Sequence, residues 1–375
     1  MSLHARHIAL LALAAALIGC DGNNDGTAPG GRLTTVGRLE RGSTIRVVAR
    51  DGLSAADSLV TNVTVTPAIA GAVSEATVLL LQTGSVTIAA RASDGRTLTT
   101  TIDVAFPPTV YFDAVASGNR DIYSVSLDGR GLTRRTTSPA DDAQPTVVAA
   151  AIVFTSMRDG NGELYSMPTT VGGAEQRLTS TAANESQPAF AAGGAALAYV
   201  SDVSGAPRVY ITPMPLINPA RLTPPTFGFG GSLEASPTWS PARDRIALVA
   251  TANGSANLFI AAAGGTPAPV AGSGSGQTDV EPAWSPDGNH IAFASTRAGT
   301  TQIFLLDVRT GTYRQLTNDA SPAGQPGWLA DGRLVFTRFA AGASTLWWID
   351  PSESAPPTQI ATGALVQPAH ATGAR

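Results

Sequence analysis

The sequence predicts an all-β protein, and three observations support this prediction. Short runs rich in Ile, Val, Phe and Leu alternate with turns, and branched and aromatic side chains favour strands. The turns contain Gly, Asp and Pro, which set the backbone angles that tight reversals need. Gly and Pro are abundant, at 39 and 26 of 375 residues, whereas only 14% of residues are charged. This composition favours many turns and few long helices.

The stretch from Pro282 to Thr317 shows the basic unit most clearly. Turns with the sequences Pro-Asp-Gly, Arg-Ala-Gly-Thr and Arg-Thr-Gly divide it into four predicted strands. These strands are Pro282–Ser285, Ile291–Ser295, Gln302–Asp307 and Tyr313–Thr317. We therefore expect one antiparallel four-stranded sheet.

The unit recurs six times. A large apolar residue marks the second strand at Phe112, Phe154, Tyr199, Leu248, Phe293 and Phe336. A second marker lies in the third strand at Tyr123, Tyr165, Tyr210, Phe259, Phe304 and Trp347. Both markers are spaced by 42 to 49 residues. Four-stranded repeats of this length are typical of β-propeller blades, so we predict a six-bladed propeller over residues 109–375.

A proline in the first strand of each unit indicates how the propeller closes. It occurs at Pro145, Pro188, Pro237, Pro282, Pro326 and Pro368. Because the sixth proline lies near the C-terminus, we expect residues 366–371 to supply the inner strand of the first blade and to remove an exposed sheet edge. In this alignment His370 takes the place of the core aromatic residue Trp284.

The N-terminal residues read as a targeting segment. Arg6 precedes an apolar run, Ile8–Ile18, which is shorter than the roughly 20 residues that span a bilayer. The segment Leu17-Ile18-Gly19-Cys20 resembles the lipobox of bacterial lipoproteins. That resemblance implies a signal peptide over residues 1–19 and lipid attachment to Cys20, the only cysteine. Residues 20–31 are polar and glycine-rich and are expected to form a flexible tether.

Residues 32–106 differ from the repeat. Their predicted strands have the spacing of an immunoglobulin-like β-sandwich. The segment from Gly84 to Arg96 resembles the closing half of bacterial Ig-like domains of the BIG2 kind. The resemblance implies a spacer, with an adhesive unit as the alternative. Pro107-Pro108 marks a stiff boundary before the propeller.

The repeat also carries a family signature. Trp239-Ser240-Pro241, Trp284-Ser285-Pro286-Asp287-Gly288 and the Leu-Thr pairs that close several units resemble TolB-type propeller repeats of the PD40/WD40-like kind. The resemblance covers residues 109–375. The expected Ig-like unit stands where TolB has a different N-terminal domain, so a role in the Tol–Pal system is not expected to transfer.

Composition excludes several classes of function. The 24 basic residues are all arginine, so neither a lysine Schiff base nor a Walker phosphate loop is present. A net charge of −4 argues against nucleic-acid binding. Beyond the predicted signal peptide the only histidines are His290 and His370, and neither has a carboxylate or a second histidine at metal-ligand spacing. The sequence contains no Gly-x-Ser-x-Gly motif, although spacing alone leaves a Ser-His-Asp arrangement open. We therefore assign no catalytic residue, metal ligand or cofactor.

Four acidic residues form the candidate site. They precede the first-strand proline by three positions: Asp142, Glu185, Glu234 and Asp279. Loops at this position gather at the channel mouth of a propeller, where four carboxylates would attract a cation such as Ca²⁺ or a basic peptide. The alternative is that each side chain caps its own turn.

Together these features predict a monomeric, lipid-anchored protein of the bacterial cell envelope, facing the periplasm or the cell surface. Its propeller channel is expected to bind an envelope protein, a peptide or a glycan. Two alternatives stay open. One is a polysaccharide- or peptide-acting enzyme that uses carboxylates such as Asp142 and Glu185, and the other is a surface adhesin with the Ig-like unit as its stalk.

Overall fold

The computed structural model describes residues 32–50, 57–58, 60–66, 71–74, 76–115, 118–215, 220–222, 233–252, 255–263, 265–274, 276–340, 343–362 and 366–373. The predicted signal peptide, Cys20 and the tether lie outside the described residues. The chain divides into two compact units, Met1–Ala105 and Phe106–Arg375. The described part contains no helix with the length and apolar character that crossing a bilayer requires.

The N-terminal unit consists of two antiparallel sheets. One has the order β1-β2-β6-β5, with β3 paired to β2, and the other has the order β4-β7-β8. The strands are β1 (Arg32–Val36), β2 (Thr44–Arg50), β3 (Asp57–Ser58), β4 (Thr61–Thr66), β5 (Gly71–Ser74), β6 (Thr77–Leu80), β7 (Gly84–Arg91) and β8 (Thr97–Val104).

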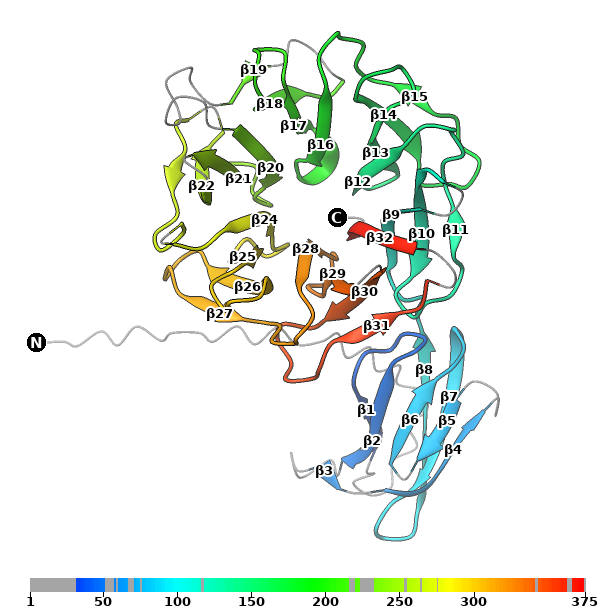
Figure 1. The fold of residues 1–375 in the computed structure, drawn as a ribbon. Coiled ribbons are helices and arrows are strands. Elements are labelled where there is room, and N and C mark those ends of the chain that lie inside the picture. The colour runs from blue at the N-terminus through cyan, green and yellow to red at the C-terminus, as the bar shows by residue number, and fades with distance from the viewer. Residues whose placement is uncertain are drawn as a thin grey trace, which may run out of the picture. The chain divides into compact units, whose positions relative to one another are not determined.

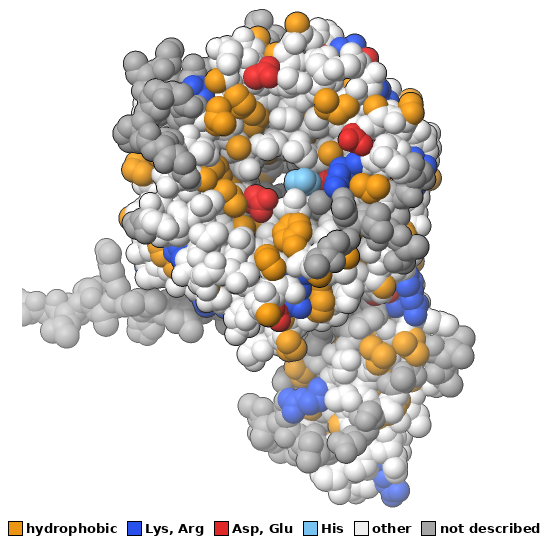
Figure 2. All heavy atoms as spheres, in the orientation of Figure 1, with side chains coloured by type: hydrophobic (Ala, Val, Ile, Leu, Met, Phe, Trp, Pro, Cys, Tyr) orange, Lys and Arg blue, Asp and Glu red, His pale blue; other side chains and the backbone are white. Residues whose placement is uncertain are grey.

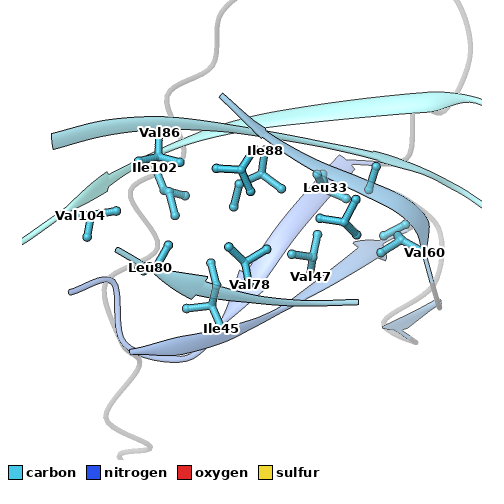
Figure 3. Packing of buried hydrophobic residues seen from close by; sticks show 14 residues of the cluster. Leu33, Ile45, Val47, Val60, Val78, Leu80, Val86, Ile88, Ile102 and Val104 are labelled. Carbon is cyan, nitrogen blue, oxygen red and sulfur yellow. The ribbon is translucent and has the colours of Figure 1, made fainter. Parts of the chain in front are cut away.

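Alternating side chains build the core of this unit. Buried and accessible residues alternate along β6 and β7, as expected for strands with one face toward a core. Ile45 and Val78 of one sheet face Ile88 and Ile102 of the other in a single cluster (Figure 3). The two sheets therefore pack face to face.

The C-terminal unit contains six four-stranded antiparallel sheets. The first comprises β9 (Thr109–Val115), β10 (Arg120–Ser126), β11 (Thr133–Arg134) and β32 (Val366–Gly373). The second comprises β12 (Asp142–Val148), β13 (Ala151–Ser156), β14 (Glu163–Pro168) and β15 (Gln176–Arg177). The third comprises β16 (Glu185–Phe190), the 3-10 turn η2 (Ala192–Gly194), β17 (Ala196–Ser201), β18 (Arg208–Pro213) and β19 (Ala220–Arg221).

The other three sheets repeat this pattern. The fourth comprises β20 (Leu233–Trp239), β21 (Arg245–Ala252), β22 (Ser255–Ala262) and β23 (Ala268–Pro269). The fifth comprises β24 (Asp279–Trp284), β25 (His290–Ser295), β26 (Gln302–Asp307) and β27 (Tyr313–Gln315). The sixth comprises β28 (Ala323–Trp328), β29 (Leu334–Ala340), β30 (Ala343–Ile349) and β31 (Thr358–Ile360). Figure 1 shows the six sheets around a common axis, which is consistent with a β-propeller.

The two sequence markers of the repeat are direct cross-strand partners. Phe293 pairs with Phe304, and the corresponding residues pair in every one of the six sheets. In the fifth sheet the two rings lie 6.1 Å apart between centroids. Aromatic pairs across antiparallel strands stabilise a sheet. The constant spacing of the markers along the chain therefore reflects a constant register.

Each sheet is covered on both faces by its neighbours. Trp284 of the fifth sheet packs with Ala247 and Val249 of the fourth, and Trp328 of the sixth packs with Ala283 of the fifth. Burial on both faces explains why β25 and β26 are almost continuously buried and lack the alternation of a one-sided strand.

The first sheet is completed by the end of the chain. β32 pairs with β9, with Val366 opposite Val115 and Gly373 opposite Val110 (Figure 1). A side chain at Gly327 of the sixth sheet would collide with the carbonyl oxygen of Ala371, so glycine permits the close approach of β32. Phe112, Leu346 and Ala371 share one core cluster, which joins the first and sixth sheets.

Candidate functional site

The structure buries the four predicted acidic residues at the start of the inner strands. Asp142 and Asp279 are fully buried and each accepts two hydrogen bonds from one arginine, at 3.0–3.1 Å from Arg158 and 2.9–3.0 Å from Arg297. Asp279 also accepts from Ser295 Oγ at 2.5 Å. Each carboxylate therefore ties the inner strand of its sheet to the end of the second strand and the turn that follows.

The two glutamates are bound in similar ways. Glu185 accepts from Thr181 Oγ1 and from Ser201 Oγ, both at 2.9 Å. Glu234 accepts from the backbone N–H of Val209 at 2.9 Å. Burial raises the pKa of Asp142 and that of Glu185, against the opposing effect of their hydrogen-bond donors. None of the four residues lines the cavity on the axis, so the expected carboxylate ring is not formed there.

A different set of residues lines that cavity, which has a volume of about 210 Å³. Five inner strands contribute the residue two positions after the expected acidic position, the C-terminal strand contributes His370, and each of these side chains is half-buried. These lining residues are Gln144, Gln187, Ser236, Glu281, Gln325 and His370. Figure 2 shows the hollow at the centre of the sheets with a histidine and a carboxylate beside it.

An unusual backbone conformation positions these side chains. All six residues have φ between 49° and 57°, in the left-handed region that non-glycine residues rarely adopt. The register of each inner strand shifts there, for example between Ala143 and Thr146. Such a bulge re-aims the side chain. Without it, Asp142 and Gln144 would lie on the same face of β12, which is why alternation alone misplaces the site.

Hydrogen bonds link the lining residues of neighbouring sheets. The backbone N–H of Gln187 donates to Oε1 of Gln144 at 3.0 Å, and that of Ser236 donates to Oε1 of Gln187 at 2.6 Å. Each glutamine thus satisfies a backbone donor on the next inner strand. The fourth sheet has Ser236, with a shorter side chain, in place of the glutamine. There the link to the fifth sheet is a different bond, in which the backbone N–H of Trp284 donates to Thr238 Oγ1 at 3.2 Å.

The series continues to the C-terminal strand. The backbone N–H of Gln325 donates to Oε2 of Glu281 at 2.6 Å, and that of His370 donates to Oε1 of Gln325 at 3.3 Å. Nδ1 of His370 then lies 2.9 Å from Oδ1 of Asp113 in the first sheet. The same oxygen accepts from the backbone N–H of Gln144 at 3.2 Å, which completes the circuit.

Opposing effects set the charge of His370. Burial disfavours the imidazolium, but the carboxylate of Asp113 and the more distant Glu281 outweigh burial and the repulsion of Arg120, so the pKa of His370 is raised. Arg120 also forms an ion pair with Asp113. The buried carboxylate of Asp113 therefore contacts both the guanidinium of Arg120 and the imidazole of His370.

Some polar groups at the cavity wall have no hydrogen-bond partner among the residues that the structure describes. Because Oε1 of Gln144 and Oε1 of Gln187 accept backbone hydrogen bonds, their Nε2 groups are left as donors. None of the described residues pairs with these Nε2 groups or with Oε1 of Glu281. Gln144 and Glu281 belong to the second and fifth of six sheets and so lie across the axis from each other (Figure 1). The wall therefore offers donors on one side and an anionic acceptor on the other.

The position of His370 differs from the alignment expected on sequence grounds. Its φ of 49° and its place in the cavity wall make it the counterpart of Gln144, and Ala371 stands where the other strands have proline. Pro368 is therefore not the sixth copy of the strand proline. In the other five strands a polar residue directly precedes that proline, and this pattern was the sequence signal for the lining residues.

The described residues do not form a ligand set for a metal ion. Among the described residues, no group of three or more His, Cys, Asp or Glu side chains is placed to hold a metal ion. The carboxylates of Asp142 and Asp279 are already bound to arginine. Ca²⁺ in the axial cavity stays a prediction from the sequence.

Comparisons with known proteins agree with the propeller arrangement. Residues 226–355 match the PD40 family, described as the TolB beta propeller domain. TolB from Acinetobacter baumannii is similar in structure, with a TM-score of 0.64 over 78% of this chain and 80% of that chain, at 14% identity. A TolB-designated protein of Agrobacterium tumefaciens gives a TM-score of 0.55 over 68% of this chain and 89% of that chain, at 16% identity. No curated protein matches the chain.

The same fold also occurs in a protein of another kind. Hydrazine synthase from Kuenenia stuttgartiensis gives a TM-score of 0.59 over 72% of this chain and 47% of that chain, at 13% identity. The chain therefore carries a TolB-like β-propeller domain. Identities this low establish a shared fold alone.

Proposed function

We propose that the protein is a lipid-anchored binding protein of the bacterial cell envelope. Its six sheets are the blades of a six-bladed propeller, and the N-terminal unit is an Ig-like spacer between the tether and the propeller. The axial cavity binds a segment of a protein or peptide, with a glycan as the alternative ligand.

The polar wall of the axial cavity carries this proposal. The Nε2 groups of Gln144 and Gln187 are donors, and Oε1 of Glu281 is an acceptor across the axis. An extended peptide presents carbonyl acceptors and N–H donors along its length, so it can satisfy both sides. A cavity of about 210 Å³ admits the tip of a flexible segment or a sugar ring, whereas a folded domain stays at the mouth.

The circuit of hydrogen bonds that links neighbouring inner strands supports a ligand-binding role for the lining residues in addition to a structural one. It holds the lining side chains before a ligand arrives, and preorganisation lowers the entropic cost of association. Glu281 places a carboxylate and His370 an imidazole in the wall of the same cavity, which favours a partner with polar or charged groups.

Capture from envelope extract, followed by calorimetry with synthetic fragments of the captured partner, tests the proposal. Glu281→Gln keeps an oxygen that can accept from the N–H of Gln325, yet it removes the negative charge. We expect this variant to weaken binding at least fivefold. Glu353→Gln changes an exposed glutamate away from the cavity and serves as the matched control.

Peptide and glycan arrays distinguish the two classes of ligand. Binding to peptides that is weakened by Glu281→Gln supports the proposal in its first form, and the same result with glycans supports the alternative. Binding that Glu281→Gln leaves unchanged would place the partner site elsewhere, and turnover of a glycan or peptide would show an enzyme.

A further inference from the structure

A second cavity continues the axial cavity along the inner strands and has a volume of about 310 Å³. Thr146, Thr238 and Thr372 line both cavities, so the two adjoin. The second is lined where the inner strands end, for example by Val148 at the end of β12 and by Trp239 at the end of β20. Every inner strand, or the turn that follows it, contributes to this wall. We call this space the strand-end cavity.

The wall of the strand-end cavity is mainly apolar. Phe190, Pro241 and Pro286 contribute from the third, fourth and fifth sheets, and each of these residues is partly accessible. No charged residue lines this cavity in the described part of the chain. Hydrocarbon that packs against such a wall is removed from water, which is favourable. The strand-end cavity is therefore suited to the apolar part of a ligand.

Glu281 supplies a charge in the adjoining axial cavity. Its Oε2 accepts from the backbone N–H of Gln325 at 2.6 Å, and its Oε1 pairs with none of the described residues. Both ring nitrogens of His370 are engaged, Nδ1 with Asp113 at 2.9 Å and Nε2 with the amide nitrogen of Gln325 at 3.1 Å. Among the described lining residues, Glu281 is therefore the charged group with an atom left for a ligand. A carboxylate oxygen in this position favours a cationic donor.

The spacing between these two features sets the length of the ligand. The shared threonines stand two residues further along the inner strands than Glu281 and its equivalents, for example Thr146 after Gln144. At about 3.3 Å per residue, this separation is about 7 Å. An aliphatic chain of roughly eight carbons, with bonds of about 1.5 Å, extends over about 10 Å. Its far end therefore passes the threonines and enters the strand-end cavity when its head lies at Glu281.

We propose that the axial and strand-end cavities together bind a single-chain alkylammonium ligand. The ammonium group donates to Oε1 of Glu281, and the aliphatic chain ends against the apolar wall of the strand-end cavity. This proposal rests on the axial cavity being a ligand site, as in the proposed function, but it names a small molecule that would compete there with a partner segment.

Octylamine, octanol and butylamine test the two parts of the site by calorimetry at pH 7.5 with the full chain. Octylamine is protonated at this pH, as a lysine side chain is. We expect it to bind at least tenfold more tightly than butylamine, because each buried methylene contributes a factor of about four. We also expect it to bind at least fivefold more tightly than octanol, which has no charge for Glu281. No octylamine binding would overturn the site, and equal binding of octylamine and butylamine would overturn the role of the strand-end cavity.

Glu281→Gln tests the head group. It should weaken octylamine binding about fivefold and leave octanol binding unchanged, whereas the exposed control Glu353→Gln should change neither. A preference for octylamine over octanol that survives Glu281→Gln would overturn the assignment of this carboxylate.

Filling the strand-end cavity tests the tail. Ala192 and Ala330 are small, accessible residues that line it, so Ala192→Phe and Ala330→Phe provide two independent filling variants. Each should weaken octylamine binding at least fivefold with little effect on butylamine. Ala174→Phe, at an exposed position away from both cavities, is the matched control. Octylamine binding that is unchanged in both filling variants would refute the proposal.

The outcome is separable from that of the proposed function. Octylamine binding requires no envelope partner, so its failure would leave capture of a peptide or glycan by the axial cavity as proposed. Conversely, octylamine binding that depends on Glu281 and on the strand-end cavity would support this inference even if no partner were captured from envelope extract.

Discussion

Nδ1 of His370 lies 2.9 Å from Oδ1 of Asp113, and the two residues are 257 positions apart in the chain. One belongs to the C-terminal strand β32 and the other to β9, so this contact joins the end of the propeller to its beginning. The backbone pairing of these strands is interrupted by two register shifts. The side-chain pair therefore reinforces a junction whose hydrogen-bond ladder is incomplete.

We expect this pair to make the stability of the closed propeller depend on pH. The pKa of His370 is raised above its ordinary value of 6.5 because Asp113 and Glu281 outweigh the burial and Arg120 that oppose protonation. A raised folded-state pKa gives stabilisation that is fully present below the unfolded pKa and is lost as pH rises through the folded pKa. Chemical denaturation between pH 6 and pH 9 should therefore show decreasing stability as pH rises above about 6.5.

His370→Gln isolates that contribution. Glutamine retains hydrogen-bonding groups but cannot become charged, so the variant should be less stable at pH 6 and should show a flatter dependence on pH. His290→Gln is the control, because His290 lies in the fifth sheet away from this junction. A wild-type pH dependence that persists unchanged in His370→Gln would contradict the prediction.

The hydrogen bonds between inner strands should contribute to stability. Gln187→Ala removes the acceptor for the N–H of Ser236 and should lower the free energy of unfolding by about 1 kcal/mol, or the melting temperature by about 2 °C. Gln187→Glu keeps an acceptor oxygen and should remain near wild type. Gln359→Ala, at an exposed position of β31, provides the control. Equal stability of Gln187→Ala and wild type would show that the hydrogen bond from Ser236 to Gln187 does not contribute to stability.

The repeat could be predicted because its signal is local. Phe293 and Phe304 are cross-strand partners in a hairpin, so their spacing along the chain is enough to fix the pairing. The lining of the cavity depends on a left-handed backbone conformation and a bulge in each inner strand, which the alternation of residues along the sequence does not reveal. A left-handed residue such as Gln144 turns its side chain away from the face expected for it, and so alternation points to the acidic position two residues earlier.

The last strand was misaligned for a related reason. Pro368 matched the strand proline by residue type, but the backbone bulge falls at His370, and Ala371 takes the proline position. Only the pairing of β32 with β9 determines that register. The aromatic markers were insensitive to such a shift because β32 lies outside the hairpin in which they pair.

The buried pair of Asp279 and Arg297 should stabilise the fifth sheet. Asp279→Ala leaves Arg297 without its carboxylate in a site where the arginine is only 17% exposed, and this should cost about 3 kcal/mol in urea denaturation. Replacing both residues, as Asp279→Ala with Arg297→Met, should recover much of the loss, because no unpaired charge remains. Unchanged stability of Asp279→Ala would show that the hydrogen bonds of this carboxylate with Arg297 and Ser295 do not stabilise the sheet.

Lipid attachment at Cys20 is testable in cells. Cys20 is the only cysteine, so label from radioactive palmitate on the full chain reports on this residue without competing thiols. We expect wild type to incorporate label and to sediment with membranes, because several acyl chains form a stable anchor. Cys20→Ser should lose the label and pass into the soluble fraction, whereas Gly19→Ala, which keeps a small residue before the cleavage point, should behave like wild type. Retention of Cys20→Ser on membranes in the absence of label would show that the protein is held there by a partner or by its own surface, and the lipid anchor would have to be abandoned.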